Sequence, residues 1–297
     1  MYISENWAAL LEPNLRKVFS DTFGDFTSNL PVLYNMATSK KAVEHDLNTD
    51  SKSTWAPKQG DIQYDDTVQG YQTDYIHTAY VSGKKFEKEI LADDQYGRIE
   101  RETRSMADGA RYYREQSGAA PFNNAFNAGT IYGDGVSLCN SAHPSLNDTS
   151  LTRSNTGVLS LTDANIEVVR LLMIKQQLGT RTPAFLNPDM IIAPIDLERP
   201  AWEALMSKGK IDTANNNPNF HLGKYKLLVW PNFLTGTKRW FMVDSRKMKE
   251  YLMWFDREPV QFFKDRDFGV LASAFAGYMR YSAGTSWPFW VHGNNPA

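Results

Sequence analysis

The spacing of apolar residues between positions 93 and 117 predicts one long helix. Apolar and small side chains recur there every three or four residues and form a single narrow stripe, made by Ile99, Thr103, Met106, Ala110 and Tyr113. We expect Asp93 and Asp94 to cap its start, and Gly118 and Pro121 to end it. At about 1.5 Å per residue the helix is roughly 35 Å long, which is long for a globular protein.

A second stretch, residues 185–207, predicts a buried strand followed by a helix. Met190–Ala193 is continuously apolar, and Pro194 begins a turn. The helix behind the turn is expected to bury the face made by Ala201, Trp202, Leu205 and Met206. Ahead of this stretch, Thr162 caps another helix, which stops at Gly179 and buries Ile166, Val169 and Met173.

Strand patterns lie on both sides of these helices. Residues 226–230, 240–243 and 258–282 read as strands, and residues 61–82 place tyrosine, isoleucine and valine among Thr, Gln and Asp. Strands with two such mixed faces are weakly specified unless something outside the subunit covers them. Residues 127–160 are rich in Gly, Ser, Asn and Thr, which predicts a loop with short strands.

The first part of the chain is predicted to be an arm and a polar extension. Residues 5–19 have roughly helical apolar spacing that Pro13 interrupts, so we expect a short helix or arm. Residues 48–74 are polar and hold too few large aliphatic side chains for a core of their own.

Composition narrows the class of protein without naming it. The 297 residues are 42% hydrophobic and 13% aromatic, enough for a sizeable core in one elaborated domain or two. A formal net charge of -2 encodes no strong preference of the whole chain for nucleic acid. No apolar run approaches the roughly 20 residues that span a bilayer, and the first residues lack a secretory-signal pattern. Synthesis in the cytoplasm is therefore expected.

The only cysteine, Cys139, lies four residues before His143, with Asp134 and Asp148 nearby. A thiol and an imidazole can form a nucleophilic pair, but such pairs are normally assembled from distant segments. The favoured interpretation is a small buried cysteine and a histidine that fixes the loop before Pro144.

No other pattern points to a catalytic, cofactor-binding or metal-binding residue. The histidines are scattered, with none at helical i,i+4 spacing, at His45, His77, His143, His221 and His292. The glycines of residues 129–135 are not followed by Gly-Lys-Ser/Thr, so a phosphate-binding loop is not predicted. We expect no catalytic site, no cofactor and no metal.

The long helix also has a basic side, made by Arg98, Arg101, Arg104, Arg111 and Arg114. Two interpretations stay open: nonspecific contact with nucleic acid, or ion pairs with Glu100, Glu102 and Glu115, which the spacing favours. Glu100 with Arg104 and Arg111 with Glu115 are the predicted pairs, because their opposite charges lie four residues apart. The C-terminal aromatic residues Trp287, Phe289 and Trp290 could stack on bases, but core or interface packing is the stronger expectation.

Several segments, in their order, resemble the major capsid proteins of tailed phages, which have the Hong Kong 97 fold, and among them the Mu-like head subunit family. The segment from Lys85 to Ile99 is similar to the family's entry into its spine helix, and residues 138–144, LeuCysAsnSerAlaHisPro, to its His-Pro loop. Residues 179–207 resemble its strand-to-helix unit. Residues 240–244 and the closing GlyAsnAsnProAla resemble its later strands and terminus, so the likeness spans roughly residues 85–297.

The resemblance implies an α+β capsid fold with five regions: N-arm 1–47, extended E-loop 48–84, peripheral domain with spine helix 85–159, axial domain 160–245, and a return to the peripheral domain over 246–297. It implies a structural protein rather than an enzyme. Copies would form pentamers and hexamers of an icosahedral shell around phage DNA, assembled in the bacterial cytoplasm. A separate scaffolding protein and a portal are the expected partners, nonspecific contact with packaged DNA stays an open interpretation, and no membrane partner is expected. A nanocompartment shell protein of the same fold and a Cys139/His143 hydrolase are the alternatives.

Overall fold

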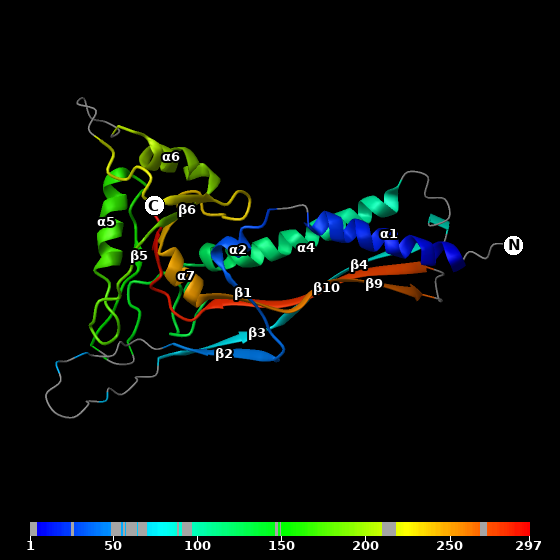
Figure 1. Ribbon diagram of the computed structural model, residues 1–297, viewed down its shortest axis with the longest axis horizontal. Coiled ribbons are helices and arrows are strands. Elements are labelled where there is room, and N and C mark those ends of the chain that lie inside the picture. The colour runs from blue at the N-terminus through cyan, green and yellow to red at the C-terminus, as the bar shows by residue number, and fades with distance from the viewer. Residues whose placement is uncertain are drawn as a thin grey trace.

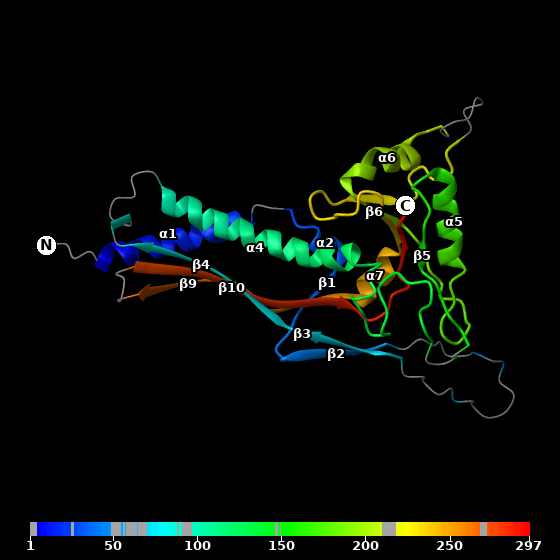
Figure 2. The same ribbon diagram turned by 180° about the vertical axis from the view of Figure 1, so that it is seen from behind.

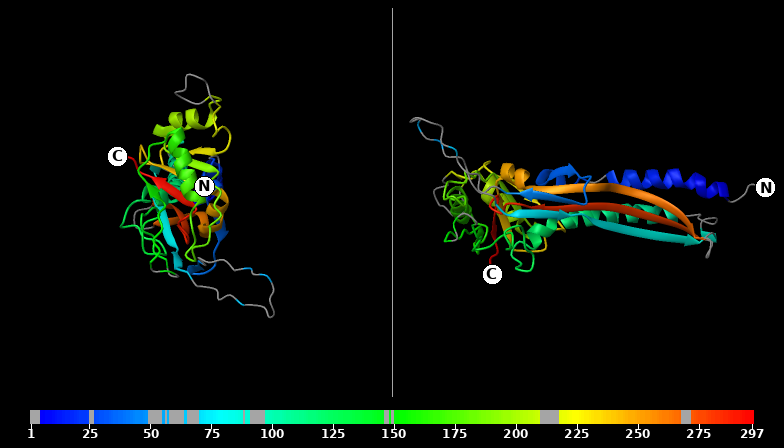
Figure 3. Two further views of the ribbon diagram at one scale, coloured as in Figure 1. Left: turned by 90° about the vertical axis from the view of Figure 1, so that its left-hand side faces the viewer. Right: turned by 90° about the horizontal axis from the view of Figure 1, so that it is seen from below.

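Figure 1 shows an elongated molecule with two parts. In the long part, helices α1 (Glu5–Gly24) and α4 (Arg98–Asn123) lie on an extended sheet, and the smaller part surrounds the C-terminus (Figures 1 and 2). Seen from below, the long part is a thin layer that ends near the N-terminus (Figure 3). This computed structural model describes residues 5–24, 27–48, 55, 57, 64, 70–87, 89–90, 97–145, 148, 150–209, 218–267 and 272–297.

A four-stranded sheet forms the floor of the long part, in the order β1-β9-β10-β4. Its strands are β1 (Asn35–Thr38), β4 (Thr78–Glu87), β9 (Leu252–Asp267) and β10 (Ala272–Thr285). β10 is antiparallel to both β9 and β4, and β1 runs parallel to the start of β9. The described residues of 258–282 thus confirm the strand prediction. The sheet joins segments from both ends of the chain.

One face of this sheet is covered by α1 and α4 (Figures 1 and 2). Both helices and both long strands supply buried apolar side chains to the contact, including Leu15, Phe19, Ile99, Met106, Phe262 and Phe275. The rings of Phe19 and Phe262 have centroids 5.3 Å apart. Each large side chain removed from water here contributes about 1.5–3 kcal/mol.

This packing explains why α1 is longer than predicted. The sequence predicts a short helix or arm because Pro13 interrupts the pattern, yet α1 is a 20-residue helix with Pro13 inside it. Proline removes one backbone donor and strains the preceding turn. Leu15 and Phe19 are buried against α4 and the sheet, and their burial offsets that cost.

Helix α4 confirms the predicted long helix, but its predicted start is wrong. The helix begins at Arg98, behind Gly97, which has a φ of 61° and provides no side-chain cap. Glycine adopts this left-handed conformation without steric cost. Asp93 and Asp94 lie outside the described residues.

The predicted end of α4 is also wrong, because the helix continues through Gly118 and Pro121 to Asn123 and has 26 residues, about 39 Å. Gly118 is required by packing rather than by a turn: a Cβ there would lie 2.1 Å from Leu30 Cδ2. The Tyr34 hydroxyl also donates to the Gly118 carbonyl at 2.7 Å. The glycine therefore lets the segment before β1 press against the helix backbone.

The buried face of α4 changes along its length. Ile99, Thr103 and Met106 are buried as predicted, whereas Tyr113 is exposed. In the second half, the buried positions include Glu115, Ala119 and Phe122. The first half packs on the long sheet and the second half reaches the smaller part, so one stripe cannot serve both contacts.

A five-stranded sheet forms the core of the smaller part, in the order β5-β11-β8-β6-β7. Its strands are β5 (Thr156–Gly157), β6 (Met190–Ala193), β7 (Lys226–Val229), β8 (Trp240–Val243) and β11 (Val291–Asn294). Around it lie α5 (Asp163–Ile174), the 3-10 turn η1 (Ile195–Leu197), α6 (Glu198–Met206) and α7 (Ser245–Tyr251). β6 and β8 are buried at every position, as their continuous apolar runs predict.

Helix α5 confirms its predicted cap and inner face. The Thr162 hydroxyl accepts a hydrogen bond from the Asn165 backbone N–H at 3.3 Å, and Ile166, Val169 and Met173 are buried. The helix ends at Ile174, earlier than the predicted stop at Gly179.

For α6 the predicted buried face is half wrong. Ala201 and Leu205 are buried, but Trp202 and Met206 are exposed, and Ala204 takes their place in the core. Positions 201, 204 and 205 share one side of a helix, while 202 and 206 lie roughly 100° further round. The two alanines let the helix approach the sheet closely, and the larger side chains point away.

Strands β2 (Val43–Leu47) and β3 (Gln72–Ile76) form a separate two-stranded antiparallel sheet beside the long one (Figure 1). Tyr75 is buried, with its ring centroid 5.1 Å from that of Phe255 in β9. The predicted strands of residues 61–82 are thus confirmed over 72–76 and from 78 onward. Residues 61–63 and 65–69 lie outside the described part.

Candidate functional site

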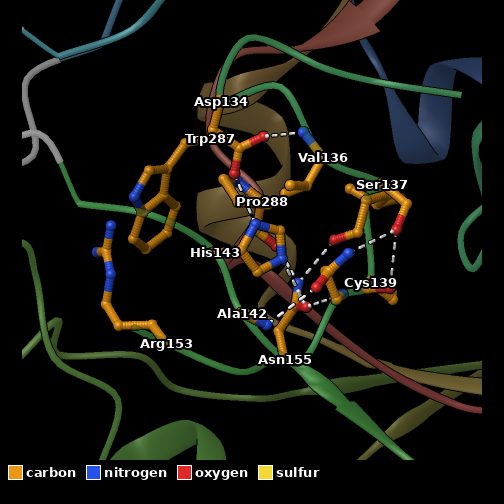
Figure 4. Close-up of polar contacts among 12 residues, drawn as sticks. Asp134, Val136, Ser137, Cys139, Ala142, His143, Arg153, Asn155, Trp287 and Pro288 are labelled. Atoms are coloured by element: carbon orange, nitrogen blue, oxygen red, sulfur yellow. Dashed lines mark hydrogen bonds and ion pairs between the residues drawn. The ribbon is translucent and has the colours of Figure 1, made fainter. Parts of the chain in front are cut away.

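The loop after α4 brings Asp134, His143 and Asn155 into contact (Figure 4). His143 is fully buried. Its Nδ1 lies 2.6 Å from Asp134 Oδ2, and its Nε2 lies 2.9 Å from Asn155 Oδ1. The ring also meets Phe289 edge-on, with centroids 5.0 Å apart. Both ring nitrogens are therefore engaged within the loop.

Asn155 is the centre of this cluster. Its Oδ1 accepts from the Asn140 backbone N–H at 2.9 Å, in addition to facing His143. Its Nδ2 donates to the carbonyls of Leu138 and Pro288 at 2.8 and 3.0 Å. One buried amide thus ties two parts of the loop to the C-terminal segment, as the dashed lines in Figure 4 show in part.

Cys139 belongs to the same loop and packs against the C-terminal strand. Its side chain is buried, and burial raises the pKa of the thiol far above the ordinary value. The thiol packs on the backbone of β11, where a Cβ on Gly293 would lie 2.5 Å from Sγ. Because Asp134 and Asn155 occupy both nitrogens of His143, that imidazole has no nitrogen left to activate the thiol.

The other histidines are distributed over the fold. His45 Nδ1 lies 2.6 Å from Asp74 Oδ1 on the exposed β2–β3 sheet, and His77 is buried between the hydroxyls of Ser39 and Ser282. In the part of the chain that the structure describes, no group of three or more His, Cys, Asp or Glu residues could hold a metal ion.

Burial of His292 makes the fold sensitive to acid. The side chain is 4% exposed, and desolvation lowers its pKa from 6.5 to about 4. The unfolded chain therefore takes up this proton first, so stability is full above about pH 6.5 and falls as the pH drops towards 4. We expect a loss of about 3 kcal/mol in the free energy of unfolding across that window.

The measurement is urea unfolding at a series of pH values. His292→Gln should show a shallower slope than the wild type, with part of the slope remaining because burial also lowers the pKa values of His77 and His221. An unchanged slope in the variant would contradict this assignment.

Part of the basic side of α4 forms contacts within the protomer. Arg114 forms a two-point contact with Asp256, at 2.8 and 3.1 Å, and its guanidinium lies 5.1 Å from the Trp254 ring centroid. Arg111 donates to the Thr22 carbonyl at 2.7 Å. These two side chains therefore hold α4 to β9 and α1.

The predicted pair between Arg111 and Glu115 is wrong. Glu115 is buried and accepts from the Ser28 hydroxyl and, at 3.1 Å, from Trp230 Nε1. Burial raises the pKa of this carboxyl. By contrast, the predicted pair of Glu100 and Arg104 is confirmed at 3.6 Å.

The C-terminal aromatic residues belong to the core. Trp287, Phe289 and Trp290 are buried in the main apolar cluster, which confirms packing as their role. Trp290 Nε1 donates to Thr285 Oγ1 at 2.9 Å, which satisfies its polar atom. No described helix is long and apolar enough to cross a bilayer.

Large exposed apolar side chains occur over much of the described surface, and three groups of them are used below. The extension around β3 and β4 exposes Tyr64, Ile76 and Val81; α5 exposes Val168, Leu171 and Leu172; and α6 with η1 exposes Ile195, Trp202 and Met206. The exposed group on α5 is not among the features that the sequence pattern predicts. A signal was present, since residues 166–174 are apolar on two sides of the helix rather than one.

Comparisons with known proteins come from structure alone. No protein-family model matches the chain, and no curated protein matches its sequence. The procapsid of bacteriophage JBD30 matches with a TM-score of 0.56 and 12% identity, over 99% of this chain and 77% of that chain. The capsid of cyanophage P-SCSP1u matches with a TM-score of 0.61 and 10% identity, over 91% and 88%.

The mature capsid of bacteriophage PhiM1 matches with a TM-score of 0.58 and 10% identity, over 92% of this chain and 88% of that chain. At such identities the likeness shows the fold. The chain therefore has the α+β fold of tailed-phage capsid proteins, as the sequence predicts.

Proposed function

We propose that this chain is a structural, non-enzymatic major capsid subunit of a tailed phage or a related particle. The observation that carries the proposal is the likeness to capsid chains over 91–99% of the chain. The finer assignment to the Mu-like head subunit family rests on the sequence resemblance of residues 85–297. The function of such a chain is to contact further copies of itself in a virion shell.

The surface of the protomer supports this proposal. Apolar side chains are exposed on the extension, on α5 and on α6. Burying them against another molecule would lower the free energy, because it removes apolar surface from water. Obligate interfaces commonly bury more than about 2,000 Å² and are more apolar than transient ones. Surfaces on several sides of one protomer are what a closed shell requires.

The five predicted regions keep their boundaries in this proposal. The N-arm is residues 1–47, the E-loop 48–84, the peripheral domain 85–159 and 246–297, and the axial domain 160–245. Helix α4 with β9 and β10 of the long sheet supports the peripheral domain, and the five-stranded sheet supports the axial one, while β1 and most of β4 join the long sheet from the N-arm and E-loop ranges. β5 and β11 add strands from the peripheral regions to the axial sheet, so the two domains share a core.

Pentamers and hexamers of this chain are the proposed assembly units, with a scaffolding protein and a portal as further partners. Arg98, Arg101 and Arg104 are exposed on α4 and are the candidates for nonspecific contact with packaged DNA. In the same proposal Cys139 and His143 have structural roles, because the cluster around Asn155 leaves no nitrogen of His143 to activate the thiol.

Self-assembly of the purified chain tests this function. Size-exclusion chromatography with light scattering should give pentamers, hexamers or shells, and negative-stain electron microscopy should show rings or closed particles. Where assembly needs a scaffolding protein, its addition should produce them. A monomer that persists at high concentration with the scaffolding protein present would count against a capsid function.

A further inference from the structure

Helix α5 is apolar on two opposite sides, and only one side is covered within the protomer. Its inner side is buried in the core, while Val168, Leu171 and Leu172 are 46%, 38% and 49% exposed. Positions 164, 168, 171/172 and 175 follow helical i,i+4 and i,i+3 spacing, so Ala164 and Lys175 extend the same outer line. We name residues 164, 168, 171, 172 and 175 the α5 stripe. An apolar stripe on a helix normally faces a packed neighbour.

A second apolar surface lies on η1 and α6. Ile195, Trp202 and Met206 are 49%, 57% and 38% exposed. Trp202 and Met206 lie four residues apart on α6, and Ile195 lies on η1 just before it. Asp196 and Glu198 lie beside them. We name Ile195, Trp202 and Met206 the α6 patch. Its large aromatic ring differs in shape from the narrow aliphatic line of the α5 stripe, so the two surfaces are not copies of each other.

The two helices bound different sides of the smaller part. In Figure 1, α5 runs along its outer edge and α6 lies across its top, and the view from behind in Figure 2 keeps them apart. A contact between unlike surfaces on different sides of a protomer is heterologous, and repeated copies close into a ring or continue as a filament. A contact of α5 with α5 of a second copy would give a two-fold dimer and leave the α6 patch exposed to solvent.

We infer that the α5 stripe of one copy packs against the α6 patch of the next copy, and that this contact closes the capsomer ring. The inference rests on the proposed capsid function and names the partner surface within it. Charge supports the pairing, because Lys175 ends the α5 stripe while Asp196 and Glu198 flank the α6 patch, and the neighbouring Arg199 is paired with Glu203 at 2.8 Å. Leu172 and Trp202 are the central side chains, since an exposed tryptophan that fills a partner surface is the usual energetic centre of an interface.

Single carboxylates placed on the two surfaces test the contact. Leu172→Asp and Trp202→Asp should each prevent pentamers and hexamers under conditions in which the wild type forms them. Both positions are exposed, so the far-ultraviolet circular dichroism should be unchanged and the melting temperature should change little. Val158→Asp is the matched control, because Val158 is exposed in the same part but belongs to neither surface. It should assemble like the wild type.

Cysteine crosslinking tests which surfaces meet. Copies with Leu172→Cys mixed with copies with Trp202→Cys should form disulfide-linked dimers on oxidation, while either variant alone should not. Cys139 is buried and stays out of the reaction. Crosslinking of Leu172→Cys alone, crosslinking to a different protein in place of a second copy, or normal capsomers from Leu172→Asp would each overturn the inference while leaving the capsid function standing. A wild type that forms no assembly under any condition would instead contradict the proposed function itself.

Discussion

Replacing residues 50–69 with a short Gly-Ser link is expected to leave a folded protomer that forms no closed shell. The two ends of this segment already meet at the base of the β2–β3 sheet. The Gly70 N–H donates to the Asn48 carbonyl at 2.6 Å, and the Asn48 N–H donates to the Tyr71 carbonyl at 3.2 Å. A short link can therefore join them without moving either strand. Gly70 must be kept, because a Cβ there would lie 2.2 Å from the Asn48 oxygen.

The expected loss of shells follows from the proposal that residues 48–84 are an intersubunit arm. Tyr64 is 89% exposed in the protomer, and laid over a neighbouring copy it gains about 25 cal/mol per Å² buried. Fixing the backbone of any segment in one conformation costs about 1–2 kcal/mol per residue, so only an extensive contact with a neighbouring copy can offset it.

The deletion must stop before β3. A larger cut through residues 52–80 would also remove Tyr75, which is buried against Phe255, and Tyr80, whose ring stacks on Tyr281 at 4.6 Å. Such a cut would destabilise the protomer, contrary to what the polar sequence alone suggests. The measurements are the melting temperature and electron microscopy.

A Gly-Ser replacement of equal length, which keeps the reach of the segment but not its side chains, is the matched control and should also fail to close shells. Normal shells from the shortened protein would show that the segment is not an intersubunit element.

Substitution of Asn155 is the second change with a large expected effect, here on stability. Asn155→Leu removes four hydrogen bonds at a buried position and leaves polar groups of Asn140, His143, Leu138 and Pro288 without their partner. Each buried polar group left unsatisfied costs about 1–3 kcal/mol. We therefore expect a loss of roughly 4 kcal/mol or more in the free energy of unfolding.

Urea unfolding measures this loss. Asn127→Ala is the control, because Asn127 also accepts a local hydrogen bond, from the Gly129 N–H at 3.0 Å, but at an exposed site. It should lose less than about 1 kcal/mol. A comparable loss in both variants, or a loss below 1 kcal/mol in Asn155→Leu, would mean that the cluster is not a structural centre.

The local sequence pattern predicts those elements whose burial depends on their own apolar spacing. The strands at 190–193 and 240–243 are buried on both faces, as their continuous apolar runs predict. The inner face of α5 follows from its 3.6-residue period, and the cap at Thr162 from its position.

The errors occur where a distant segment decides the outcome. Gly118 ends no helix because Leu30 and Tyr34 pack against it. Glu115 forms no surface pair because Trp230 and Ser28 bury it. These partners are far away in sequence, and nothing in the local spacing of α4 indicates them.

In the loop around His143, too, local spacing predicts some of the contacts and distant segments decide the others. The spacing of Cys139 and His143 correctly suggested a loop held by a histidine, but Asn155 was missed, since a single asparagine in a polar loop carries no pattern. The sequence places Trp202 on the predicted buried face of the helix that follows the strand at 190–193. In the protomer it faces outward, and the sequence alone does not distinguish burial within a subunit from burial between subunits.

The pairing of the long sheet has a consequence for when the protein can fold during synthesis. Glu87 in β4 pairs with Ala272 in β10, and Thr78 pairs with Tyr281, so the sheet beneath α4 needs residues from the last tenth of the chain. Until the ribosome has released them, α1 and α4 have no complete surface to pack on, and contacts of such long range form slowly. Nascent chains on one messenger RNA therefore stay incompletely folded until translation is almost complete, and they cannot assemble with other copies before then.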